Sequence, residues 1–215
     1  MDRKFAIFDM DGTLVDSMAY WCGLGREYLR GQGLDGPTAR QVEDMKTMTM
    51  EESSAYIAQA YGLSFTPQQI AADMTQRMVR HYRTDVPLKP GVAAYLDKLK
   101  ADGVRCCVAS ATDTPLIRDC LTRLGVADRF EFMLSCSDVG AGKSSPLVYL
   151  TAARMLGAEP RQVAVFEDAL RAVHTARDAG FYVVGVYDAA TKGQWPQVAA
   201  LSDEAMEIMG TSLPR

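Results

Sequence analysis

The sequence has no excess of basic residues, which argues against a nucleic-acid-binding protein. Lysine and arginine number 23 against 27 acidic residues, for a formal net charge of -4, whereas proteins that bind nucleic acid or anionic membranes carry a basic patch. No apolar run approaches the roughly 20 residues of a membrane-spanning helix. Acids interrupt the first apolar run, which is too short for a signal peptide. We therefore expect a soluble, cytoplasmic protein with no nucleic-acid or membrane partner.

Cysteines are few, and they form no CxxC pair. The chain has five, an odd number, and Cys106 and Cys107 lie together in an apolar run, where cysteine usually acts as a small hydrophobic residue. This pattern favours a reduced, cytosolic compartment. The sequence also has no internal repeats. A length of 215 residues suits one large domain or a domain with an insertion.

Short apolar runs predict a parallel β-sheet. They lie at Lys4–Phe8, Val104–Ala109, Val163–Phe166 and Tyr182–Val186, with a weaker run at Phe132–Leu134. Runs of this length separated by helical patterns are typical of strands that are buried on both faces. We therefore expect an α/β fold, with a Rossmann-like parallel sheet as its core and helices on both faces.

A helical insertion interrupts this pattern. Far more residues separate the first two strands than the few dozen of a β-α-β unit, and the helical stretches between them are Met18–Arg30, Met50–Tyr61 and Pro67–Arg83. We expect a discontinuous core at residues 1–14 and 86–215. Residues 15–85 would form the inserted helical domain.

Polar and charged residues follow the predicted strands. They are Asp9 and Asp11 after the first, Ser110 and Ala111 after the second, and Glu167 and Asp168 at the end of the fourth. Lys143 lies in the loop before the helix that leads to the fourth strand. The carboxyl ends of parallel strands share one edge of a sheet, where ligands bind. Four carboxylates at one edge repel each other, and one lysine does not neutralise them. Because all the donors are oxygens, we expect Mg²⁺ there.

This set of residues predicts phosphoryl transfer. Ser110 and the backbone amides that open the following helix, with Ala111 first, would bind a phosphate. Lys143 would place a positive charge beside that phosphate. One carboxylate would attack phosphorus, and a second would move the protons. In a strand, Asp9 and Asp11 would point the same way. Gly12 would allow a tight turn, and Thr13 would hydrogen-bond the nucleophile.

The motifs resemble those of the haloacid dehalogenase-like hydrolase superfamily. The matching residues are DMDGTLVD, Ser110, Lys143 and the Phe166–Asp168 run, in the family's order and across essentially the whole chain. The insertion is similar to the helical cap of the group that contains β-phosphoglucomutase and phosphoglycolate phosphatase. The resemblance implies Asp9 as the nucleophile that forms an aspartyl-phosphate, and Asp11 as the general acid/base. It also implies Ser110 and Lys143 on the phosphate.

The resemblance also implies a Mg²⁺ site at Asp9, the Asp11 carbonyl and Asp168, with Glu167 in or near it. The chain departs from the family in two places. It reads Lys143-Ser144-Ser145-Pro146 where relatives often read KPxP, and Ala169 follows Asp168 where they often have serine.

Three functions remain open from the sequence. The leading one is a Mg²⁺-dependent phosphatase of a small phosphorylated metabolite, a sugar phosphate or similar monoester, acting as a monomer or weak dimer. A β-phosphoglucomutase-like phosphomutase would use the same residues. A phosphorylatable receiver module also combines clustered acids, a hydroxyl and a lysine, but it would accept one phosphoryl group and stop.

The insertion offers few polar candidates for substrate contact. Lys46 and His81 are two of them. Arg77, Arg80 and Arg83 recur at helical spacing, and we expect them to form a solvated face.

Overall fold

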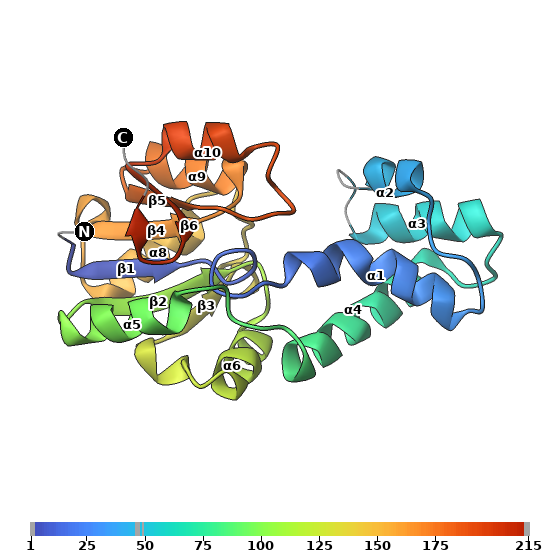
Figure 1. Ribbon diagram of the computed structural model, residues 1–215, viewed down its shortest axis with the longest axis horizontal. Coiled ribbons are helices and arrows are strands. Elements are labelled where there is room, and N and C mark those ends of the chain that lie inside the picture. The colour runs from blue at the N-terminus through green and yellow to red at the C-terminus, as the bar shows by residue number, and fades with distance from the viewer. Residues whose placement is uncertain (1–2, 46–47, 49, 213–215) are drawn as a thin grey trace. The chain divides into compact units, whose positions relative to one another are not determined.

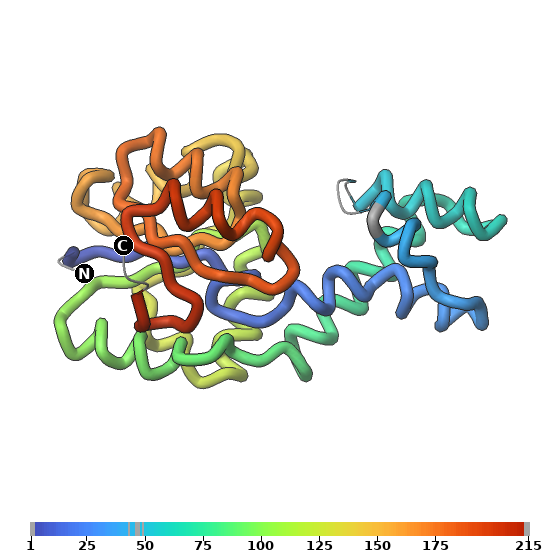
Figure 2. Tube along the Cα trace, turned by 45° about the horizontal axis from the view of Figure 1, so that its top comes forward, coloured from blue at the N-terminus to red at the C-terminus, as the bar shows by residue number. Residues whose placement is uncertain are grey.

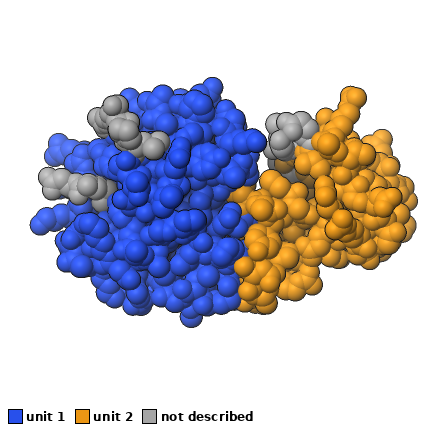
Figure 3. All heavy atoms as spheres, in the orientation of Figure 1, with its two compact units in different colours: residues 1–17, 86–215 blue, residues 18–85 orange. Residues whose placement is uncertain are grey.

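The chain forms two compact units. The computed structural model describes residues 3–45, 48 and 50–212. The core unit comprises Met1–Ser17 and Val86–Arg215, and the helical unit comprises Met18–Asp85 (Figure 3). Residues 15–17, which the sequence assigned to the insertion, lie in the core unit. Val15 forms a β-bridge with Leu88, and the Asp16 amide donates to the Pro87 carbonyl at 3.0 Å, so these residues stay with the returning chain.

In the described part of the core unit, seven strands form one sheet in the order β3-β2-β1-β4-β5-β6-β7. Their bounds are β1 Phe5–Phe8, β2 Arg105–Ser110, β3 Met133–Ser135, β4 Val163–Glu167, β5 Tyr182–Val186, β6 Glu204–Ile208 and β7 Thr211–Ser212. Neighbouring strands are parallel except β6 and β7, which are antiparallel. The predicted Rossmann-like sheet is confirmed.

Strand β1 lies between β2 and β4, and this order places the site. Phe8 of β1 pairs with Val108 of β2 and with Phe166 of β4. The order reverses at β1, because the chain goes from β1 to β2 and β3 on one side and then crosses to β4. In such sheets the crevice at the carboxyl ends of the strands around this point is where ligands bind.

Helices cover both faces of the sheet, as expected. The core unit contains α5 Val92–Ala101, α6 Thr114–Arg123, α7 Cys136–Val139, α8 Leu147–Leu156, α9 Leu170–Asp178, α10 Trp195–Leu201 and the short 3-10 helices η1 Ala127–Arg129 and η2 Pro160–Gln162. Figure 1 shows α9 and α10 on one face and α5 and α6 on the other. In Figure 2, α9 and α10 again lie side by side. The face under α8, α9 and α10 buries alternate strand residues such as Ile7, Val165 and Val183.

The sequence missed the last two strands. β6 has the sequence EAMEI, and only Met206 is buried in it, so it lacks the apolar run that marks a strand buried on both faces. α2, Ala39–Met45, was also missed. Helix α9 begins at Leu170. Asp168 therefore lies in the loop after β4.

The helical unit buries apolar stripes between its helices. These are α1 Met18–Gly31, α2, α3 Met50–Tyr61 and α4 Pro67–Thr84. Thr66 caps α4 by accepting from the Gln69 amide at 3.3 Å, and Pro67 follows the cap. The buried residues of α4 are Ile70, Met74, Met78 and Tyr82, and this four-residue period places them on one face. No helix of the described residues has the length and apolar character that crossing a membrane requires.

A charged network around His81 links α1 to the end of α4. His81 Nε2 and Glu27 Oε2 lie 2.7 Å apart, and so do His81 Nδ1 and Asp85 Oδ2. Arg77 pairs with Asp73 at 2.5 Å and contacts Glu27 at 3.4 Å. Arg77 and His81 side chains are only 19% and 15% exposed. The expected solvated face is therefore wrong for Arg77, because its guanidinium is held by acids within the unit.

These contacts predict a pH-dependent stability of the helical unit. Burial lowers the pKa of His81, but its hydrogen bonds to the Glu27 and Asp85 carboxylates outweigh this effect and raise the pKa above the ordinary value. The stabilisation is therefore complete below the unfolded pKa of about 6.5, and it is lost as pH rises through the higher folded pKa. Amide protection of α1 and α4, measured by hydrogen exchange, should fall as pH rises above about 6.5.

His81→Gln should remove that pH dependence. His174→Gln is the matched control, because His174 lies exposed on α9 and is the other histidine of the chain. Equal pH dependence in wild type and His81→Gln would contradict the role of this network.

Candidate active site

Three buried carboxylates meet at the carboxyl ends of β1 and β4. Asp9 directly follows β1, Glu167 ends β4, and Asp168 comes next in the chain. Their exposed fractions are 5%, 0% and 4%, and one carboxylate oxygen from each lies within 4.8 Å of the others. The Asp9 amide donates to the Phe166 carbonyl at 3.0 Å, which continues the strand pairing to the first acid.

Lys143 lies among these acids. Its ammonium forms ion pairs with Asp9 Oδ1 and with Glu167 Oε1, the second at 2.5 Å. The hydroxyl of Tyr149 on α8 also donates to Glu167 Oε1, at 2.6 Å. Glu167 Oε2 is buried, and it has no hydrogen-bond partner among the residues that the structure describes. A buried carboxylate oxygen without a partner is costly, and a bound cation would satisfy it.

Burial and mutual repulsion change the acidity of the cluster. Burial raises the pKa of Asp9 well above its ordinary value, with Lys143 opposing and Glu167 reinforcing the shift. Burial, with repulsion from Glu167, also raises the pKa of Asp168 to about 7. For Lys143, burial lowers the pKa, but Asp9 and Glu167 outweigh it and raise the pKa overall. Lys143 stays charged, and the acids bind protons readily where no second cation is present.

Asp11 lies in a turn and not in a strand, which corrects one step of the sequence argument. β1 ends at Phe8, and the Met10 carbonyl accepts from the amides of the three residues Thr13 to Val15. Strand alternation therefore does not set the direction of Asp11. Instead, its carboxylate accepts hydrogen bonds from Ser17 at 2.5 Å and from Thr112 at 2.7 Å.

Gly12 and Thr13 support Asp168 directly. Gly12 has φ of +79°, and a Cβ there would lie 2.5 Å from Asp168 Oδ2. Only glycine gives both this conformation and this close approach. The Thr13 hydroxyl donates to Asp168 Oδ1 at 3.4 Å, whereas we expected it to bond the nucleophile. The GT pair therefore shapes the position of the second acid.

Ser110 ends β2 at the same edge of the sheet. It is 1% exposed, and its hydroxyl accepts from the Thr112 amide at 3.1 Å. Ala111 is exposed and follows directly. Ser110 thus fixes the loop whose Thr112 holds Asp11. Its contact with a phosphate stays a prediction.

Two further charged residues were missed from the sequence. Lys89 donates to Asp188 Oδ2 at 2.8 Å, with side-chain exposures of 11% and 3%, and Asp188 lies two residues beyond β5. The sequence signal for Asp188 is its place just after the fifth strand, because residues at the carboxyl ends of parallel strands share one edge. Lys89 and Tyr149 carried no such signal, because a linker lysine and a helical tyrosine are common.

Comparison with known proteins assigns the family. Residues 6–186 match the model of the haloacid dehalogenase-like hydrolases. The chain belongs to this family. β-Phosphoglucomutase from Bacillus subtilis (strain 168) is 31% identical to this hydrolase over 193 residues, which cover 85% of this chain and 83% of that protein.

A further relative and a solved structure are also similar to this hydrolase over most of its length. Hexitol phosphatase B from Escherichia coli (strain K12) is 25% identical over 175 residues, covering 81% of this chain and 79% of that protein. The crystal structure of a CbbY variant from Rhodobacter sphaeroides, in complex with xylulose-(1,5)bisphosphate, superposes with a TM-score of 0.76 at 22% identity. The superposition covers 96% of this chain and 94% of that one.

The donor set of this hydrolase fits a divalent cation. The candidate ligands Asp9, Glu167 and Asp168 are buried, and Lys143 pairs with the first two. When all three carboxylates are ionised, one ammonium group leaves two negative charges in a buried place. Oxygen donors and an orphaned Glu167 oxygen suit Mg²⁺ better than a soft metal.

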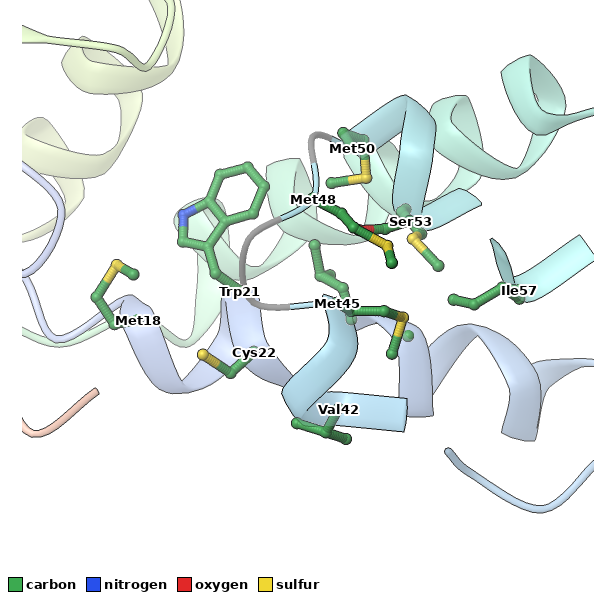
Figure 4. Close-up of a pocket in the computed structure, with 12 residues that line it drawn as sticks. Met18, Trp21, Cys22, Val42, Met45, Met48, Met50, Ser53 and Ile57 are labelled. Carbon is green, nitrogen blue, oxygen red and sulfur yellow. The ribbon is translucent and has the colours of Figure 1, made fainter. Parts of the chain in front are cut away.

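The helical unit contains an apolar pocket of about 340 Å³. Trp21, Met45, Met48, Met50 and Ile57 are among its lining residues, and Figure 4 shows their side chains around it. The described lining carries no charged side chain, so the pocket itself is unsuited to hold a phosphate. Lys46 lies outside the described residues.

The raised pKa of Asp168 predicts a pH-dependent response to Mg²⁺. Below pH 7 this carboxyl is protonated, and protons compete with the metal. Because its folded pKa is raised, the metal-free protein loses stability as pH rises through about 7. A fixed Mg²⁺ concentration, about 100 times the Kd at pH 8, should raise Tm by roughly 5–10 °C at pH 8. The same concentration should raise Tm by clearly less at pH 6.

Differential scanning fluorimetry of protein stripped with a chelator gives this measurement directly. Asp168→Asn is expected to lose most of the Mg²⁺-induced shift at both pH values. The same shift at pH 6 and pH 8 in the wild type would contradict the competition between protons and metal at this carboxyl.

Proposed function

We propose that the protein is a Mg²⁺-dependent phosphatase that hydrolyses a small phosphorylated metabolite through an aspartyl-phosphate. The observation that carries this proposal is the convergence of Asp9, Lys143, Glu167 and Asp168 in one buried cluster at the carboxyl ends of β1 and β4. Membership of the hydrolase family supports it.

Asp9 is the proposed nucleophile. One of its oxygens would attack phosphorus, a bond to the phosphoryl group would form, and the bond from phosphorus to the leaving oxygen would break. Lys143, which pairs with Asp9 and Glu167, would neutralise charge beside the phosphoryl group. Ser110 and the backbone at Ala111 would bind the phosphate oxygens.

Asp11 is the proposed general acid/base. Its two carboxylate oxygens are held by the hydroxyls of Ser17 and Thr112, which fix its orientation two residues from the nucleophile. It would give a proton to the leaving oxygen in the first step. In the second step it would take a proton from the water that attacks phosphorus and releases Asp9.

We propose that the cation is held by Asp9, the Asp11 carbonyl, Glu167 and Asp168. When bound, Mg²⁺ supplies positive charge that stabilises the phosphoryl oxygens during transfer. Gly12 and Thr13 would keep Asp168 in place for this site, since Gly12 leaves room for its carboxylate and the Thr13 hydroxyl donates to it.

The substrate proposed is a phosphorylated sugar or similar monoester. Two relatives are named as a phosphoglucomutase and a hexitol phosphatase, and this favours a phosphorylated carbohydrate. We propose that the helical unit acts as a cap that selects the leaving group. Its chain leaves the core unit at Ser17, which bonds Asp11, and returns at Val86.

Asp9→Asn should abolish turnover while the protein remains folded. Losing the nucleophile should lower kcat with p-nitrophenyl phosphate on the order of a thousandfold or more. Asp178→Asn is the matched control, because Asp178 lies exposed at the end of α9. Near-normal turnover in Asp9→Asn would refute the mechanism. A wild type that is labelled once and then stops would indicate a receiver module.

Phosphomutase activity is the second candidate, and the 31% identity to β-phosphoglucomutase favours it. A mutase returns the phosphoryl group to a sugar hydroxyl, whereas a phosphatase gives it to water. We expect free phosphate from sugar phosphates, with no need for glucose 1,6-bisphosphate. Isomerisation of β-glucose 1-phosphate that depends on this activator, with little phosphate released, would replace the phosphatase proposal.

A further inference from the structure

Lys89 joins three segments around the site. It lies in the returning segment that runs from Val86 to α5, and its ammonium donates to the Gly12 carbonyl at 2.6 Å, the Tyr187 carbonyl at 2.5 Å and Asp188 Oδ2 at 2.8 Å. An ammonium has three donor hydrogens, so these three acceptors use its full capacity. The loop after β1 is thus tied to the loop after β5.

The backbone around Lys89 is also fixed. Its amide donates to the Leu14 carbonyl at 2.9 Å, and Asp188 Oδ1 accepts from the Ala190 amide at 2.8 Å. Both partners of the ion pair are therefore anchored at a second point. A buried pair with all its hydrogen bonds satisfied holds a defined geometry.

The Gly12 carbonyl connects this tether to the proposed metal site. Gly12 lies close to Asp168: a Cβ on Gly12 would overlap the Asp168 carboxylate. A shift of the Gly12 peptide therefore changes the space available to Asp168. Thr13, the next residue, donates to the same carboxylate. The position of Asp168 thus depends on a peptide that Lys89 holds.

We propose that Lys89, with Asp188, is a positioning residue for the Mg²⁺ site, acting on Asp168 through the Gly12 peptide. This inference rests on the proposed function for the identity of the metal site. In this proposal Lys89 contacts neither the phosphate nor the leaving group. Partners one step removed from the metal ligands typically change metal affinity 10–100-fold when they are lost.

The test is direct Mg²⁺ binding by calorimetry to chelator-treated full-length protein, without substrate. Lys89→Met alone would leave Asp188 buried and unpaired, and it risks unfolding the protein. The main variant is therefore Lys89→Met with Asp188→Leu, which replaces the whole pair by apolar side chains. Lys98→Met is the matched control, because Lys98 is 67% exposed and pairs with Asp102 on the surface.

We expect the double variant to bind Mg²⁺ roughly 10–100-fold more weakly than wild type, with Lys98→Met unchanged. The Tm of the metal-free double variant should stay near that of wild type. If the pair had only a structural role, weaker Mg²⁺ binding would come with a lower Tm. In turnover assays the half-saturating Mg²⁺ concentration should rise more than the KM for p-nitrophenyl phosphate. Normal Mg²⁺ binding by the folded double variant would overturn the inference.

Failure of the inference and failure of the proposed function are separate outcomes. Wild type that binds Mg²⁺ but does not turn over a phosphate ester would refute the phosphatase and leave the role of Lys89 intact. Equal binding by wild type and double variant, with normal turnover, would refute the role of Lys89 alone. Wild type that binds no Mg²⁺ would refute both.

Discussion

An excess of buried negative charge at the carboxyl ends of β1, β4 and β5 is the constraint on which the site depends. Asp9, Glu167, Asp168 and Asp188 are each at most 5% exposed, and the two lysines that pair within this set do not balance them. Burying like charges is unfavourable unless protons or cations compensate. Such a cluster fits a divalent cation, whose positive charge would compensate the excess negative charge.

The fold produces this convergence with little local strain. Three parallel strands end at one edge of the sheet. The acids after β1, at the end of β4 and after β5 therefore lie close together, although their side chains are short. The turn after β1 adds the finer arrangement. The Met10 carbonyl gathers three amides, Gly12 lies against Asp168, and Lys89 holds the Gly12 carbonyl from the returning chain. The segment that leads into and out of the helical unit therefore also builds the site.

Much of this site was predictable from the sequence, because strand ends in a parallel sheet share an edge. That rule predicted Asp9, Lys143 and the Glu167-Asp168 pair at one edge of the sheet. It failed for the direction of Asp11 and the partner of Thr13, since a turn of hydrogen bonds, and not strand alternation, arranges residues 10–15. The contact between Lys89 and Asp188 joins distant segments, and β6 has too few buried residues to be read as a strand. Pairings of this kind follow from tertiary packing that no local pattern encodes.

The most direct test of the central claim is to locate the covalent phosphoryl group during turnover. Wild-type protein would be quenched while hydrolysing p-nitrophenyl phosphate with Mg²⁺, treated with borohydride, and analysed by peptide mass spectrometry. Borohydride reduces an acyl phosphate to an alcohol, so an aspartyl-phosphate becomes homoserine. The account predicts this mark at Asp9, only when substrate and Mg²⁺ are both present. A mark at Asp11 or another residue, or continuous turnover with Asp9 never modified, would contradict it.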